Sequence, residues 1–189
     1  MEIEPLLKRA LAILEKSLGS EHPDVADCLN SFAWLYHNQG KYAEVEPFYE
    51  RALAIREKAF GAEHLDVADS LDNLAHLYCN HLDKYVEAES LYERALATRE
   101  KALGAEHPDV ADSLDNLAHL YHRQGKYAEA EPLYERALAI KGKALGAEHP
   151  DVATILENYA SLLLATDKES EAEKLKARAS AIRKRYSPA

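Results

Sequence analysis

The chain has 189 residues, and its 33 acidic side chains outnumber its 23 basic ones, which gives a formal charge of −10. This acidity argues against a nucleic-acid-binding protein, because such proteins usually need a basic face to displace phosphate counterions. No apolar run approaches the ~18 residues of a membrane span, no secretory signal is visible, and two cysteines without metal-ligand spacing fit a reducing cytoplasm.

One repeated phrase organises the chain. Gly-x-Glu-His-x-Asp-Val-Ala begins at Gly19, Gly61, Gly104 and Gly146, at spacings of 42, 43 and 42 residues. Each unit contains two stretches with apolar residues at the three- and four-residue steps of an amphipathic helix. In chain order we expect an unpaired helix at 2–18 and helix pairs at 22–60, 64–103, 107–145 and 149–186. This makes about nine helices in a single domain over residues 1–189, and the last helix serves as a cap.

Residues that recur at the same place in every unit are best explained by packing or capping. The four histidines of the repeated phrase are expected to cap the first helix of each pair or to pack its loop, rather than to bind metal. A ladder of arginines is expected to form ion pairs between helices. These residues are His22, His64, His107 and His149, and Arg9, Arg51, Arg94, Arg136 and Arg178.

The repeats resemble the tetratricopeptide repeat, in the long form of kinesin light chains and their prokaryotic relatives. The resemblance rests on the phrase above and on Tyr-Glu-Arg-Ala-Leu-Ala, which starts at Tyr49, Tyr92 and Tyr134. It implies an all-α fold, a right-handed superhelical solenoid of antiparallel helix pairs whose first helices line a concave groove. It also implies a protein–protein interaction scaffold. No phosphate-binding loop, nucleophile elbow or Cys/His dyad is present, so we predict neither an enzyme nor a cofactor.

The resemblance places one face of each first helix in the groove. In this family asparagines of the groove hold the backbone of an extended peptide, and this role carries over to Asn73, Asn116 and Asn158. Trp34 is expected either to anchor a partner or to pack against the unpaired first helix. The candidate partner-binding residues are Asn30, Trp34, His37, Asp69, Asp72, Asn73, His76, Asp112, Asp115, Asn116, His119, His122, Arg123 and Asn158.

Carboxylates distinguish this groove from those of the better-known relatives. Groove positions that carry Lys or Arg in chaperone clamps and kinesin light chains hold Asp69, Asp72, Asp112 and Asp115 here. We therefore expect a partner segment that contains Lys or Arg, because like charges would repel an acidic peptide. The alternative is that these aspartates and asparagines only solvate the helix surface.

Other features leave further alternatives open. His76, Cys79, His119 and His122 form an incomplete ligand set, so no metal site is predicted. Six basic residues and no acid lie between Lys174 and Ala189. They compensate the helix dipole, or they contact a membrane surface or a tubulin-like filament, with which similar bacterial proteins are associated. The unpaired terminal helices also permit a scaffold that self-associates weakly, as opposed to a monomer.

Overall fold

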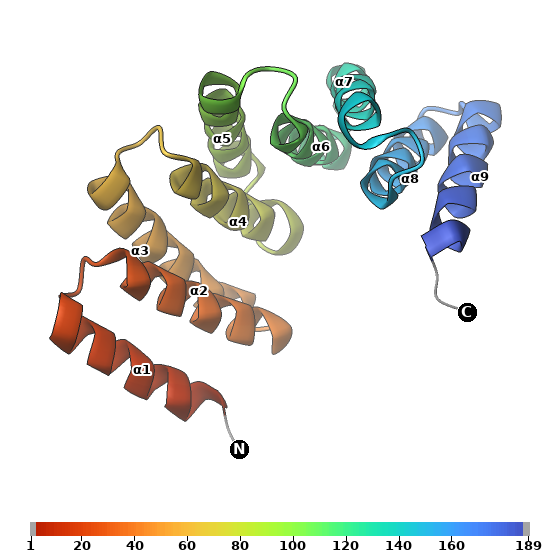
Figure 1. The fold of residues 1–189 in the computed structure, drawn as a ribbon. Coiled ribbons are helices and arrows are strands. Elements are labelled where there is room, and N and C mark those ends of the chain that lie inside the picture. Colours follow the sequence, from red (N-terminus) through yellow and green to blue (C-terminus); the bar gives the residue numbers. More distant parts are fainter. Residues whose placement is uncertain (1–2, 187–189) are drawn as a thin grey trace. The chain divides into compact units, whose positions relative to one another are not determined.

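The structure, a computed structural model, describes residues 3–186 and is all-α over that range. The nine helices expected from the repeats are confirmed there, whereas residue 2 of the expected first helix lies outside the described residues. The helices are α1 Ile3–Leu18, α2 Pro23–Asn38, α3 Tyr42–Phe60, α4 Leu65–His81, α5 Tyr85–Leu103, α6 Pro108–Arg123, α7 Tyr127–Leu145, α8 Pro150–Ala165 and α9 Glu169–Tyr186 (Figure 1).

The chain divides into two compact units, residues 1–98 and 99–189, and the boundary lies within α5. In the first unit α2 packs against α1 and α3, and α3 packs against α4. In the second unit α6 packs against α7, α7 against α8, and α8 against α9. We call α2, α4, α6 and α8 the first helices and α3, α5, α7 and α9 the second helices.

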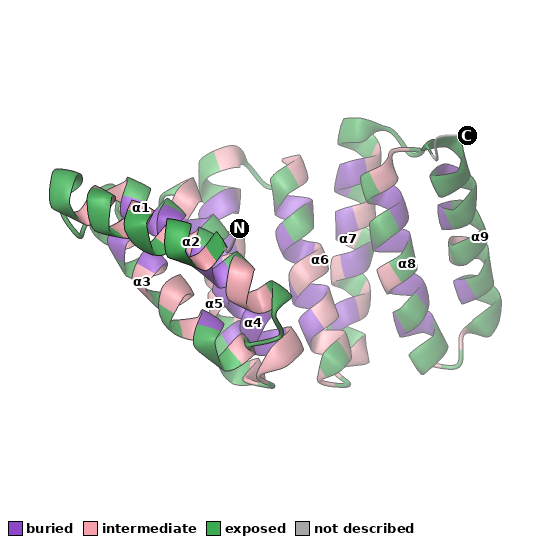
Figure 2. Cartoon of the chain, turned by 90° about the horizontal axis from the view of Figure 1, so that it is seen from below, coloured by how far each residue is buried: buried purple, intermediate pink, exposed green. Residues whose placement is uncertain are grey.

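The core of each unit is formed by apolar stripes that meet between paired helices. In the first unit Val25, Ala26 and Leu29 of α2 pack with Ala52 and Ile55 of α3, and all five are buried. The two alanines expose nothing to solvent, and side chains of this size allow helices to approach closely. Figure 2 shows buried residues on the helix faces that meet their partners, whereas the opposite faces are mostly exposed.

Each first helix begins at a histidine cap, as the repeated phrase predicts. The Nδ1 atom of His22 accepts a hydrogen bond from the backbone N–H of Asp24 at 3.2 Å. The same bond forms at His64, His107 and His149 with the aspartate two residues later. One of the backbone donors that a helix start leaves unpaired is thereby satisfied in every repeat.

Three members of the arginine ladder form the expected ion pairs between successive second-helix positions, whereas Arg178 donates to the backbone carbonyl of Ala147. Arg51 contacts Glu15 of α1 at 2.6 Å, and Arg136 contacts Glu100 of α5 at 2.7 Å. Arg94 pairs with Glu57 in the same way. These pairs are partly exposed, so each contributes at most about 1 kcal/mol and serves mainly to fix the register of the helices.

We predict that His107→Ala lowers the free energy of unfolding by about 1 kcal/mol, because α6 loses its side-chain cap. Urea denaturation measures this difference. His107→Asn is the matched control, since asparagine is a good cap and should keep most of the stability. Equal losses in the two variants would mean that the ring packs the loop rather than capping the helix.

Candidate partner-binding surface

The candidate residues lie on the side of the first helices that is opposite to the buried stripe. Spacings of three and four residues place them on one face of a helix. We call this side the polar face. In the first unit it carries seven of the candidates, and in the second unit it carries the other seven. They are Asn30, Trp34 and His37 on α2; Asp69, Asp72, Asn73 and His76 on α4; Asp112, Asp115, Asn116, His119, His122 and Arg123 on α6; and Asn158 on α8.

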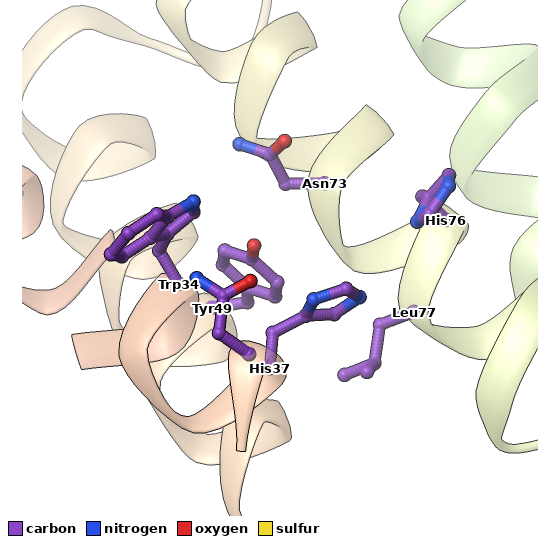
Figure 3. Close-up of a pocket in the computed structure, with 7 residues that line it drawn as sticks. Trp34, His37, Tyr49, Asn73, His76 and Leu77 are labelled. Carbon is purple, nitrogen blue, oxygen red and sulfur yellow. The ribbon is translucent and has the colours of Figure 1, made fainter. Parts of the chain in front are cut away.

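A pocket opens on the polar face of the first unit. Its cavity of about 280 Å³ is lined by residues of three helices, and Figure 3 shows the side chains of α2 and α4 around it with Tyr49 of α3. Trp34 is 64% exposed, so most of its side chain is accessible to solvent. Four candidates meet at this pocket: Trp34, His37, Asn73 and His76.

A histidine that the sequence analysis did not select lies beside the pocket. The Nε2 atoms of His37 and His81 are 3.1 Å apart, and Tyr42 stacks on the His81 ring with 3.7 Å between ring centroids. Burial lowers the pKa of His76, and the proximity of His37 lowers it further. The signal for His81 in the sequence is a one-residue insertion between Tyr78 and Tyr85, which makes α4 one residue longer than α2 and α6 and places His81 at its end.

In the second unit, two candidates are bonded to each other. The Asn158 amide donates to both carboxylate oxygens of Asp115, at 3.0 and 3.1 Å. Burial raises the pKa of Asp115 to about 6; the Asn158 hydrogen bond and Lys141 oppose this rise, and Asp112 adds to it. The amide of Asn158 therefore already has an acceptor, which a peptide backbone would have to replace.

Cations from the second helices reach the acids of the polar face. Arg56 contacts Asp27 at 2.6 Å, and Lys141 contacts Asp112 at 2.8 Å. Arg183 contacts Glu157 of α8 at 3.0 Å. These cations recur at the repeat spacing with Arg99, a periodic signal that the sequence analysis did not use. The polar face is consequently less negative than a count of its aspartates indicates.

The remaining candidates are not gathered into the described pocket. Asp69 and Arg123 are exposed, whereas Asn116, His119 and His122 are half-buried. Burial lowers the pKa of His122, and Arg123 lowers it further. Within residues 3–186 no group of three or more His, Cys, Asp or Glu side chains is arranged to hold a metal ion. Over the same range, no helix combines the length and apolarity needed to cross a bilayer.

Comparisons with known proteins identify the repeats. The tetratricopeptide repeat profile matches residues 1–58, 37–80, 66–143 and 114–185. A solved structure from Podosopora anserina, a putative kinesin light chain with nearly identical TPR-like repeats, is 31% identical to this chain. The match covers 98% of this chain and 87% of that one, with a TM-score of 0.77. BtubC (BKLC) from P. vanneervenii is 30% identical over 98% of this chain and 75% of its own, with a TM-score of 0.82.

More distant comparisons add little. MamA is 16% identical, with 94% of this chain and 86% of that one covered and a TM-score of 0.62, so it shares the fold alone. No curated protein sequence matches the chain.

We predict that Asp115→Asn stabilises the protein more at pH 7.5 than at pH 4.5. A carboxyl whose pKa rises on folding binds its proton more tightly when folded, so stability falls as pH rises from about 4, the unfolded value, to about 6. Asparagine removes that loss and keeps an acceptor for Asn158. Urea denaturation of both proteins at the two pH values measures the difference, and a stability gain that is the same at both would contradict the shifted pKa.

Proposed function

Because the chain belongs to the tetratricopeptide repeat family, we propose that it is a non-catalytic scaffold that holds an extended segment of a protein partner on its polar face. The observation that carries the proposal is the pocket at Trp34. A large aromatic side chain left exposed beside a cavity is the usual centre of a binding interface. Partner binding would remove this apolar surface from water.

The composition of the pocket suits one apolar side chain of an extended segment. Tyr49 and Leu77 supply apolar surface, and Trp34 supplies a broad aromatic face. The amides of Asn38 and Asn73 lie at the same cavity, where each offers a donor and an acceptor to a backbone. An apolar contact fixed by a few polar groups is the common pattern of a recognition site.

The charge of the polar face favours a segment with Lys or Arg, although less strongly than the aspartates alone suggest. Asp27 and Asp112 of the polar face each contact a cation of a second helix. A basic segment would compete with those cations for the carboxylates. Since the contacts are near the surface, the preference should be strongest at low salt and weaken as salt screens it.

A second candidate function is that of a kinesin-light-chain-like adaptor that links a tubulin-like filament or a membrane surface through the polar face and the basic end of α9. Similarity to BtubC supports the filament version. The membrane version is weakened because Arg183 and Arg185 contact Glu157 and Glu148 within the chain. These ion pairs reduce the positive charge that α9 could offer to an anionic surface.

A third candidate is a scaffold that self-associates through α1. Ile3, Leu6 and Ile13 of α1 are 53%, 52% and 56% exposed. The equivalent of Ile13 in α3 is Ile55, which is 2% exposed because α2 covers it. Within the described chain α1 packs mainly against α2, and Arg51 of α3 reaches its Glu15. The apolar strip of Ile3, Leu6 and Ile13 is left exposed and available to a second copy.

We predict that Trp34→Ala weakens peptide binding by about 30-fold, the factor that corresponds to a hot spot of about 2 kcal/mol. Peptides selected by display on the full chain and measured by fluorescence anisotropy provide the test, and a micromolar Kd (about −8 kcal/mol) is expected for the parent. Tyr186→Ala is the control, since Tyr186 is an equally exposed aromatic residue outside the pocket.

The same peptides test the charge preference. Replacement of their Lys and Arg by Glu should weaken binding at low salt, and the difference should shrink at high salt. Binding that is indifferent to Trp34→Ala, with unchanged circular dichroism, would refute the pocket as the anchor. Tighter binding of the acidic peptides would refute the charge preference alone.

For self-association, we predict that the mass from light scattering rises with protein concentration and that Ile13→Glu keeps the protein monomeric. A charge in the apolar strip would have to be buried without a partner when two copies meet, which is costly. Ala12→Glu, on an exposed neighbouring position of α1, is the control. A monomer mass at every concentration of the parent chain would eliminate this candidate.

A further inference from the structure

Three histidines converge at one end of the first unit. His37 comes from the last turn of α2, and His76 and His81 come from the second half of α4. The Nε2 atoms of His37 and His81 are 3.1 Å apart, while the ring centroids of His76 and His81 are separated by 6.1 Å. His37 and His76 also line the pocket (Figure 3).

The distance between the two Nε2 atoms is close to the span of a metal site. Zn²⁺ lies about 2.0–2.1 Å from imidazole nitrogen, so two such ligands at a tetrahedral angle are about 3.3 Å apart. In the metal-free pair only one ring can donate, because the two nitrogens share a single proton. Replacing that proton by a cation requires a displacement of a few tenths of an ångström.

The surrounding side chains hold the pair in this orientation. Tyr42 stacks on His81 with the planes 12° apart, and the edge of the same ring meets His37 at a centroid distance of 5.2 Å. Rings fixed by their neighbours lose less conformational freedom when they coordinate an ion.

We propose that His37 and His81 bind a divalent transition-metal ion through their Nε2 atoms, with His76 as a third ligand after rotation of its side chain and water in the remaining position. Imidazole nitrogen suits Zn²⁺, Ni²⁺ and Cu²⁺, whereas Ca²⁺ and Mg²⁺ prefer oxygen. In the present side-chain conformations, only two of the proposed ligands, His37 and His81, are close enough together to share an ion, and the described residues contain no group of three.

The site is specific to one repeat and accounts for a local departure in the sequence. His81 belongs to the segment Cys79-Asn-His-Leu-Asp-Lys84, which is one residue longer than its counterparts His37-Asn-Gln-Gly-Lys41 and His122-Arg-Gln-Gly-Lys126. The counterpart of His37 in α6 is His122. The position 44 residues later, where His81 stands relative to His37, holds Thr166 instead of a histidine. The chain therefore provides its own matched control for a lone histidine at this position.

The single tryptophan of the chain is a built-in reporter for the site. Trp34 lines the same cavity as His37 and His76, so Ni²⁺ or Cu²⁺ bound there should quench its fluorescence. Titration of the full chain should give a saturable, one-to-one change that a chelator reverses. Zn²⁺, which does not quench, should compete with Ni²⁺ and should give the same stoichiometry by calorimetry.

Single histidine-to-asparagine variants test which side chains bind the ion. His81→Asn and His37→Asn should each weaken Zn²⁺ binding by about tenfold or more, since even changes to residues around a ligand cost this much. His76→Asn should weaken it less, and His122→Asn should leave it unchanged. Circular dichroism checks that the asparagine variants remain folded.

Two results would overturn the proposal. Equal Zn²⁺ affinity in the parent, His37→Asn and His81→Asn proteins would place the ion elsewhere. The absence of saturation below millimolar metal would mean that the pair is only a hydrogen bond between two rings. Neither result bears on peptide binding, because Trp34→Ala tests that function separately.

Discussion

The burial of one apolar stripe between paired helices is the constraint on which the rest of the structure depends. Leu29 and Ile55 illustrate it, because each is covered only when α2 and α3 pack together. A helix that uses one face for this purpose must present its other face to solvent. The same packing that stabilises the fold therefore creates the polar face, and residues there are free to differ between repeats.

The scaffold also modifies the charge of that face. Lys141 is buried by its own helix and its neighbours but reaches Asp112, and Arg56 bridges Asp27 and Ser70. Such contacts are part of the packing, since the long side chains lie along apolar surface and end at a carboxylate. A basic segment of the proposed partner would therefore have to compete with these internal cations for the carboxylates.

The two units use one framework for different chemistry. The first unit combines an exposed indole with a histidine pair, whereas the second unit joins Asp115 to Asn158 and raises the pKa of that carboxyl. The capping histidines and the arginine ladder are the same in both. Repetition thus maintains stability, and the proposed partner and ion sites both lie where the repeats differ.

The sequence by itself determined the nine helices of residues 3–186, the histidine caps of the first helices and three ion pairs of the arginine ladder. His22 and Asp24 are two residues apart, and Arg51 recurs with Glu15 at the repeat spacing, so local geometry and periodicity suffice for these features. Tertiary structure decided the exposure of Trp34 and the meeting of His37 with His81. Those depend on the distance between helices and on side-chain rotamers, which no spacing within one helix can specify.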